Sequence, residues 1–204
     1  RHAGNLAHAL KTPLTVIMNS ATAQAPDLAE TVIREATTMR RQVDHHLARA
    51  RAVGRRGHSH SRAEVWQSLE SVERAVGRLY RHVRLDMAGN KEVAVRVERQ
   101  DLDEMIGNLV ENAAKYGGGS VFVTVEDQGE MVAIIIEDDG RGIPEKDRAR
   151  IFDRGVRLDS GKPGTGLGMA IVRDVAEIYN GTIELDESED MGGLLVRLKL
   201  PKAV

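Results

Sequence analysis

Four short segments of this chain carry residue types that together could transfer a phosphoryl group. The first contains His8, whose neutral imidazole nitrogen can act as a nucleophile. The other three offer asparagines on a predicted helix, a carboxylate followed by glycines, and a glycine triplet, all suited to holding a nucleotide. In sequence order the segments are His8-Ala9-Leu10-Lys11-Thr12-Pro13-Leu14, residues 108–116, Asp138-Asp139-Gly140-Arg141-Gly142 and Gly164-Thr165-Gly166-Leu167-Gly168.

His8 differs from the other histidines because a proline follows it in the same predicted helix. Pro13 offers no N–H to the carbonyl of Ala9, so we expect the helix to be loosened or bent beside the imidazole. Lys11 and Thr12 follow His8 by three and four residues, on the same helical face. Thr12 could orient water for the reverse, dephosphorylating reaction. Most lone histidines in helices are structural or solvated, and we interpret those at positions 2, 45, 46, 58, 60 and 82 in that way.

Asn108, Asn112, Lys115 and Tyr116 share one face of a helix that the pattern predicts over residues 101–116. An amide oxygen can bind a hard cation such as Mg²⁺ that takes further ligands from phosphates and water. An ammonium group can balance the charge of a triphosphate. Taken alone, this face could equally be a solvated surface, and it is the other segments that favour nucleotide binding.

The two glycine-containing segments are weak signals when taken singly. Asp138 directly follows a β-branched run, and Gly140 and Gly142 allow close backbone approach, although an ordinary surface turn has the same composition. The triplet ending at Gly168 opens a predicted helix, where N–H groups and the helix dipole favour phosphate. A dinucleotide-binding turn would look similar, but no strand–turn–helix unit of that kind precedes it.

In this order, the four segments resemble the H, N, G1 and G2 boxes of the sensor histidine kinases of two-component signalling, over nearly the whole chain. The resemblance implies that ATP phosphorylates His8, and that the phosphoryl group passes to an Asp of a response regulator. It also implies dephosphorylation of that regulator. In this family the residues matching His8, Lys11, Thr12, Asn108 and Lys115 are catalytic, and the one matching Asn112 binds Mg²⁺.

The resemblance also assigns the nucleotide pocket residue by residue. The residue matching Asp138 accepts a hydrogen bond from the adenine amino group, which selects adenine over guanine. Residues 151–154 resemble the F box and residues 154–163 the ATP lid, although three cations there could belong to a solvated polar loop. The implied nucleotide-binding residues are Asn108, Asn112, Lys115, Tyr116, Asp138, Gly140, Gly142, Ile143, Phe152, Arg154, Arg157, Lys162, Gly164, Thr165, Gly166, Leu167 and Gly168.

One departure from the family pattern leaves alternatives open. Many histidine kinases carry Glu or Asp directly after the reactive histidine, whereas this chain has Ala9, as in the PhoQ-like branch. What orients His8 is therefore open, and a nucleotide-binding pseudokinase or a phosphatase-only protein is the alternative. A gyrase-, Hsp90- or MutL-like ATPase is disfavoured, because those enzymes place a Glu base where this chain has Asn108, and an amide cannot accept the proton of water.

Composition limits the remaining possibilities. The 204 residues, 41% of them hydrophobic, suffice for one domain with a small second one, and the formal charge of −2 disfavours nucleic acid as a partner. The absence of Cys excludes thiolate chemistry and disulfides. No apolar run reaches the length of a membrane span. Because the chain starts without Met, close to His8, we expect a fragment: the cytoplasmic region of an inner-membrane sensor whose missing N-terminal segments hold the membrane helices.

The hydrophobic periodicity predicts an α+β protein with two domains. Residues 1–54 should form an antiparallel helical hairpin, residues 55–61 a linker, and residues 62–204 an α/β sandwich. The resemblance implies that the hairpin carries the phosphoacceptor and that the sandwich has the ATP-binding fold shared by histidine kinases, gyrase, Hsp90 and MutL. Apolar stripes on both hairpin helices predict a homodimeric four-helix bundle. In the second domain we expect helices at 64–80, 101–116 (capped by Asp101) and 165–179, and strands at 82–87, 93–97, 120–126, 131–137, 182–185 and 194–200.

Overall fold

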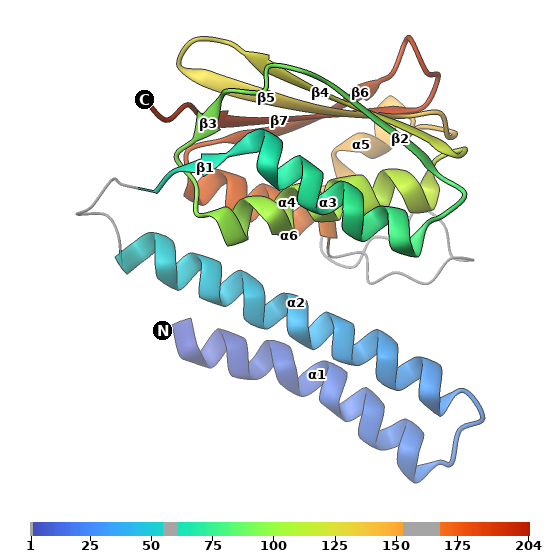
Figure 1. Cartoon of the computed structure of the whole chain (residues 1–204). Helices are drawn as coiled ribbons and strands as arrows, with labels where there is room; N and C mark the ends of the chain where they lie inside the picture. The colour runs from blue at the N-terminus through green and yellow to red at the C-terminus, as the bar shows by residue number, and fades with distance from the viewer. Residues whose placement is uncertain (1, 55–60, 153–167) are drawn as a thin grey trace.

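The computed structural model describes residues 2–54, 61–152 and 168–204, which form a helical hairpin packed against an α/β sandwich (Figure 1). The hairpin consists of α1 (His2–Thr22) and α2 (Leu28–Gly54), and α1 continues through Pro13. In the part of the chain that the structure describes, no helix is long and apolar enough to cross a membrane.

Large apolar side chains on both helices of the hairpin remain in contact with solvent. Exposed apolar side chains of this kind can be covered by another helix pair. These exposed side chains are Leu14, Met18, Val32, Ile33 and Leu47.

The sandwich is built on a five-stranded mixed sheet with the strand order β2-β4-β5-β7-β6. Strand β2 (Arg84–Gly89) runs parallel to β4 (Ser120–Asp127), and every other neighbouring pair is antiparallel. The predicted hairpin of β4 with β5 (Met131–Asp138) is confirmed, with Gly129 in its turn at φ 88°. The remaining strands are β6 (Thr182–Glu187), β7 (Leu194–Pro201) and a short separate pair, β1 (Ala63–Glu64) with β3 (Ala94–Val95).

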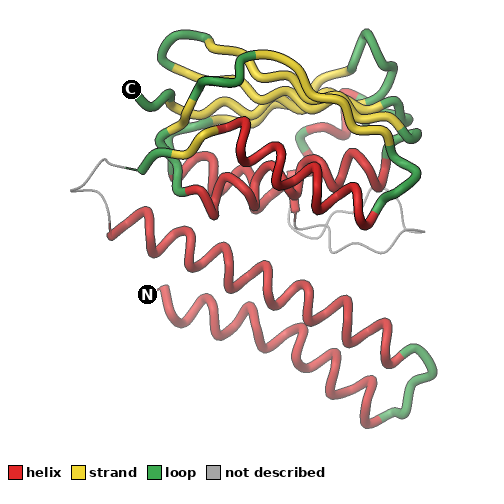
Figure 2. Tube along the Cα trace, viewed as in Figure 1, coloured by secondary structure: helices red, strands yellow, loops and turns green. Residues whose placement is uncertain are grey.

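Three helices cover one face of this sheet, the face toward the hairpin (Figure 2). They are α3 (Val65–Leu79), α4 (Arg99–Tyr116) and α6 (Gly168–Ile178), and α5 (Glu145–Arg148) and a 3₁₀ turn (Arg150–Phe152) follow β5. The core lies between the sheet and these helices, where Leu102, Ile134 and Leu198 are fully buried. The sequence-based expectation of a mixed sheet covered by helices is thus confirmed.

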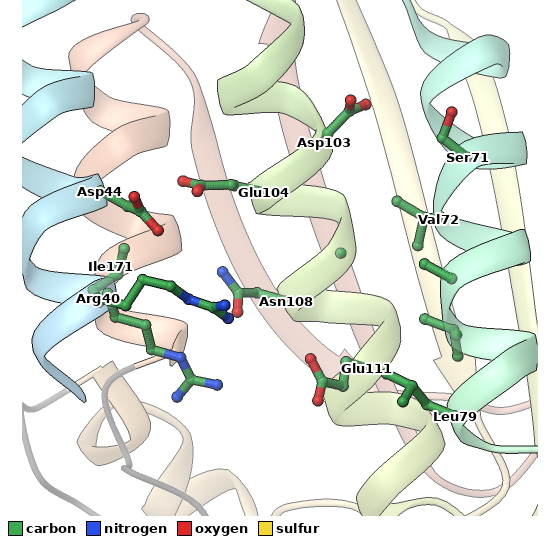
Figure 3. Close-up of a pocket in the computed structure, with 14 residues that line it drawn as sticks. Arg40, Asp44, Ser71, Val72, Leu79, Asp103, Glu104, Asn108, Glu111 and Ile171 are labelled. Carbon is green, nitrogen blue, oxygen red and sulfur yellow. The ribbon is translucent and has the colours of Figure 1, made fainter. Parts of the chain in front are cut away.

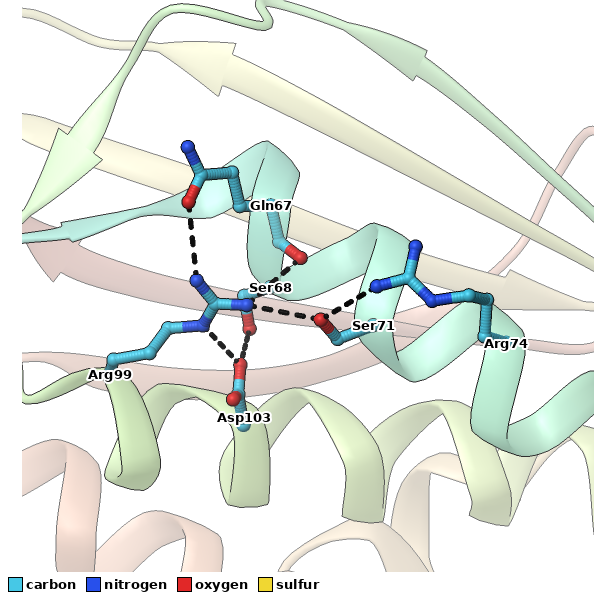
Figure 4. Close-up of polar contacts among 6 residues, drawn as sticks. All are labelled: Gln67, Ser68, Ser71, Arg74, Arg99 and Asp103. Carbon is cyan, nitrogen blue, oxygen red and sulfur yellow. Dashed lines mark hydrogen bonds and ion pairs between the residues drawn. The ribbon is translucent and has the colours of Figure 1, made fainter.

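A polar cluster fixes α3 against α4 (Figure 4). Arg99 pairs with Asp103 at 2.8 Å and also donates to the Gln67 carbonyl at 3.1 Å and to Ser71 Oγ at 3.0 Å. Ser68 Oγ donates to the same Asp103 oxygen at 2.5 Å. Because these bonds tie the first turn of α4 to α3, they set the rotation of the helix that carries Asn108 and Asn112.

The predicted cap of α4 was wrong. The helix begins two residues earlier, at Arg99, with Glu98 at the N-cap position and no side-chain capping bond. Asp101 instead lies buried in the first turn and accepts a hydrogen bond from the Tyr179 hydroxyl, just beyond the end of α6. An Asp three residues before a Glu has the local pattern of a cap, but here a distant tyrosine uses the carboxylate.

Candidate nucleotide-binding site

Asp138 is the end of β5, whose residues 132–136 are buried, and its own side chain is only 6% exposed. Its Oδ1 accepts hydrogen bonds from the backbone N–H groups of Gly140 at 2.9 Å and Leu194 at 3.2 Å. Burial raises the pKa of this carboxyl above its usual value, and the two hydrogen bonds act in the opposite direction. Among the described residues nothing donates to Oδ2, which leaves a carboxylate oxygen free to accept a bond from a ligand.

The neighbouring Asp139 has a different role. Its Oδ1 accepts from the backbone N–H groups of Gly118 at 2.9 Å and Ser120 at 3.0 Å. These bonds hold the connection between α4 and β4 against the end of β5. Of these two adjacent carboxylates, Asp138 is buried and keeps one oxygen without a donor among the described residues, whereas Asp139 organises the loop beside it.

Glycines surround Asp138 because the backbone approaches it closely from two other segments. A Cβ on Gly193, between β6 and β7, would lie 2.2 Å from Asp138 Oδ1, and the Gly193 N–H donates to the Asp138 carbonyl at 3.0 Å. A Cβ on Gly140 would lie 2.8 Å from the Tyr116 carbonyl oxygen, at the end of α4. The sequence interpretation missed Gly193, although the pair Gly192-Gly193 between two predicted strands was a usable signal.

The asparagine face of α4 begins at a cavity and ends beside Asp138. Asn112 and Lys115 are half-buried in the last turns of α4, Tyr116 is 42% exposed, and the Lys115 ammonium lies 5.7 Å from the Tyr116 ring centroid. Asn108, one turn earlier, lines a cavity of about 400 Å³ between α2, α3 and α4 (Figure 3). The structure therefore brings Asn112, Lys115 and Tyr116 near the strand end, and it places Asn108 toward the hairpin.

Charged side chains from both domains meet in this cavity. Arg40 and Arg41 of α2 line it together with Glu104 and Glu111 of α4. The Tyr80 hydroxyl donates to Glu111 Oε1 at 3.2 Å. Burial, and then the adjacent Glu111 carboxylate, raises the pKa of Tyr80 to about 12, so its hydroxyl remains a proton donor at neutral pH.

The remaining expected site residues fall into three groups. Gly142 has φ 67°, Ile143 is buried, and the half-buried Phe152 ring lies 5.0 Å from the guanidinium carbon of Arg173. On the hairpin, His8, Lys11 and Thr12 are exposed. Gly168 begins α6, whereas Arg154, Arg157, Lys162, Gly164, Thr165, Gly166 and Leu167 lie outside the described residues.

The described side chains leave room for only a small protein contribution to a Mg²⁺ site. Within residues 2–54, 61–152 and 168–204, no group of three or more His, Asp or Glu side chains is arranged to hold a metal ion. A single amide oxygen, such as that of Asn112, fits a cation that takes its other ligands from nucleotide phosphates and water. The residues present thus fit Mg²⁺ that enters with a nucleotide.

Comparison with known proteins agrees with this geometry. Residues 97–204 match the family described as histidine kinase-, DNA gyrase B- and HSP90-like ATPase. The sensor protein kinase CarS of Pseudomonas aeruginosa is 35% identical over 204 residues, which cover 97% of this chain and 45% of CarS. The sensor protein PhoQ of Escherichia coli K12 is 32% identical over 192 residues, covering 90% of this chain and 40% of PhoQ.

A solved structure supports the same assignment. The mycobacterial sensor histidine kinase MprB superposes with a TM-score of 0.64 at 26% identity, covering 70% of this chain and 97% of that one. The chain spans less than half the length of the two curated relatives named above. Since the family match covers more than half of the sequence, the chain belongs to the histidine kinase-, DNA gyrase B- and HSP90-like ATPases, and within them to the sensor histidine kinases.

Proposed function

We propose that this chain is an ATP-dependent protein-histidine kinase that phosphorylates its own His8 and passes the phosphoryl group to an Asp of a response regulator. The observation that supports the proposal is the buried Asp138 beside the end of α4: the backbone holds one of its oxygens, and no described residue donates to the other. That arrangement suits an adenine amino group, and His8 offers an exposed nucleophile on a separate hairpin.

Each residue has a definable task in this reaction. Asp138 would bind adenine, and Lys115 would balance phosphate charge near Asn112. When bound through Asn112, Mg²⁺ would supply charge neutralisation of the phosphate oxygens. The His8 nitrogen lone pair would form the N–P bond as the bond from the γ-phosphorus to the bridging oxygen breaks. ADP would leave with that electron pair, and the proton on the other imidazole nitrogen would pass to solvent.

The amide side chain of Asn108 favours a reaction in which ATP phosphorylates a histidine over one in which water hydrolyses ATP. It stands four residues before Asn112, lines the cavity, and carries an amide, which cannot accept a proton from water. We further propose that Thr12, one turn from His8, positions water when the phosphorylated regulator is dephosphorylated. The pseudokinase alternative rests only on Ala9.

The exposed apolar side chains of the hairpin support a homodimer. These residues, among them Ile33 at 69% and Met18 at 60%, lie on helices that a second hairpin can cover. We expect residues 1–54 to dimerise and residues 61–204 to remain monomeric while still binding ATP. Light scattering of the full chain at micromolar concentration tests this, and a monomer would contradict it.

We propose that segments outside this sequence supply the sensor region and membrane attachment of the whole protein.

The decisive experiment is labelling with [γ-³²P]ATP. We expect incorporation that is labile in acid and stable in base, as a phosphohistidine requires. His8→Gln should abolish incorporation and leave ATP binding intact, because nucleophile and pocket lie in separate domains. His82→Gln, at an exposed histidine of the ATP-binding domain, is the control and should label normally. Base-stable, acid-labile label in His8→Gln would show that another histidine is the acceptor.

A further inference from the structure

A buried histidine joins the two domains. His45 of α2 is 4% exposed, and its Nε2 lies 3.4 Å from Oδ2 of Asp174, on α6 of the ATP-binding domain. At this distance and orientation Nε2 has no hydrogen-bond partner among the described residues. The ring packs edge-on against His46, with 5.6 Å between centroids. The sequence interpretation had treated His45 as structural or solvated, and nothing local reveals that it meets the other domain.

The chemistry of this contact makes it specific for one position of the domain. Burial removes water from the imidazole nitrogen, so the Asp174 carboxylate 3.4 Å away stabilises it by electrostatic attraction rather than by a hydrogen bond. The Asp174 carboxylate is the acceptor that faces it, and α2 packs directly on α6. A shift of the domain along α2 would keep apolar contacts but separate these two groups, so the pair favours one register.

That register places the ATP-binding domain at the level of His8. His8 lies 14 residues before Thr22, the end of α1, and His45 lies 17 residues after Leu28, the start of α2. At a rise of ~1.5 Å per residue, they lie about 21 and 26 Å from the turn, which is less than one helical turn apart. Yet α2 lies between α1 and the ATP-binding domain (Figure 1), and His8 is exposed on α1. The ATP-binding domain is therefore docked at the level of His8 along the hairpin, but it packs on α2 and not on α1, the helix that carries His8.

We propose that His45 and Asp174 form an interdomain latch, which holds the ATP-binding domain in a resting position and must open before His8 is phosphorylated. The regulatory role of the latch depends on the proposed function. The contact between His45 and Asp174 does not depend on it. His45 regains water when the domain moves away, and the Asp174 side chain is already 29% exposed, so the open state does not strand a buried polar group.

The docking arm of the test uses fluorescence transfer in the full chain. The sequence has no Cys, so Glu30→Cys in α2 and Glu130→Cys in the turn after β4 can be labelled selectively. Asp174→Asn and His45→Gln should each lower or broaden the transfer efficiency, and the exchanged pair, His45→Asp with Asp174→His, should restore it. Asp190→Asn, an exposed residue of the same domain, is the matched control. Unchanged efficiency in both single variants would overturn the latch.

The activity arm measures the initial rate of labelling by [γ-³²P]ATP. Asp174→Asn should label several-fold faster than the unsubstituted chain, the exchanged pair should return toward its rate, and Asp190→Asn should match it. If the variants release the ATP-binding domain but label at an unchanged or lower rate, the docked position is not a resting state. If the unsubstituted chain takes up no label, the proposed function fails, while the docking arm still decides whether the two residues hold the domains together.

Discussion

The substitution Asp138→Asn tests the different roles of the two carboxylate oxygens of Asp138, the candidate acceptor for adenine. Because Oδ1 already accepts from the Gly140 and Leu194 N–H groups, the asparagine must keep its oxygen there and place its NH₂ group where Oδ2 now lies. The adenine amino group would then face a donor in place of a charged acceptor. A hydrogen bond to a charged group is worth about 2–3 kcal/mol, so ATP affinity should fall by about 30- to 150-fold.

Calorimetric titration with ATP measures this loss directly. Asp139→Asn is the matched control, since Asp139 binds only the loop N–H groups of Gly118 and Ser120, and its affinity for ATP should change much less. Unchanged affinity in Asp138→Asn would remove Asp138 from the nucleotide site. Equal losses in the two variants would mean that loop geometry, and not an acceptor at Asp138, governs binding.

The same substitution should make the nucleotide-free protein more stable at neutral pH. Burial raises the pKa of Asp138 in the folded state above its unfolded value of 3.8, so the folded state holds its proton more tightly. The favourable contribution is complete below the unfolded value and is lost as the pH rises through the folded one. The difference between the melting temperatures at pH 5 and pH 7 should therefore be smaller in Asp138→Asn than in the unsubstituted chain. If the two proteins show the same pH dependence, the raised pKa of Asp138 does not contribute to it.

Four further changes test separate parts of the site. Asn112→Ala should abolish the tightening of ATP binding by Mg²⁺ in calorimetry, and persistent tightening would exclude it as the ligand. Thr12→Ala should leave autophosphorylation largely intact and slow dephosphorylation of the regulator. Ala9→Glu should raise autophosphorylation about 10-fold if orientation of the imidazole limits the rate, whereas no change would mean that another group orients it. Gly193→Ala should lower ATP affinity more than 10-fold and cost about 1–3 kcal/mol of stability, since its Cβ would overlap Asp138, whereas Gly77→Ala, with open space around it, should be neutral or stabilising.

The extent to which sequence predicts this molecule depends on the range of the interactions. The β4–β5 hairpin follows from alternation and a Gln-Gly turn, and the face shared by Asn108 and Asn112 follows from helical spacing. The bond from Tyr179 to Asp101 spans 78 positions, so no local pattern contains it. The close approach of Gly193 to Asp138 likewise exists only after β7 pairs with β5.

The pairing of His45 with Asp174 was equally out of reach of the sequence. It depends on how two domains dock, and a histidine on a helix has the same local appearance whether water or another domain faces it. The segment from Arg154 to Leu167, interpreted as nucleotide-binding, lies outside the described residues, and its roles remain predictions. The domain boundaries at 54 and 61 and the role of His8 also stay predictions.

The strand order of the sheet has a consequence for how the protein is made. Strand β7 is the last in the sequence, yet it lies between β5 and β6, and Arg96 N–H donates to the Pro201 carbonyl beside the short β1–β3 pair. The ATP-binding domain therefore cannot close its core until residue 201 has left the ribosome. The hairpin emerges some 150 residues earlier, which at roughly 5–20 residues per second is many seconds. During that interval the exposed apolar side chains of the hairpin are available to a neighbouring nascent chain, so the proposed dimer could form on one messenger before either subunit can bind ATP.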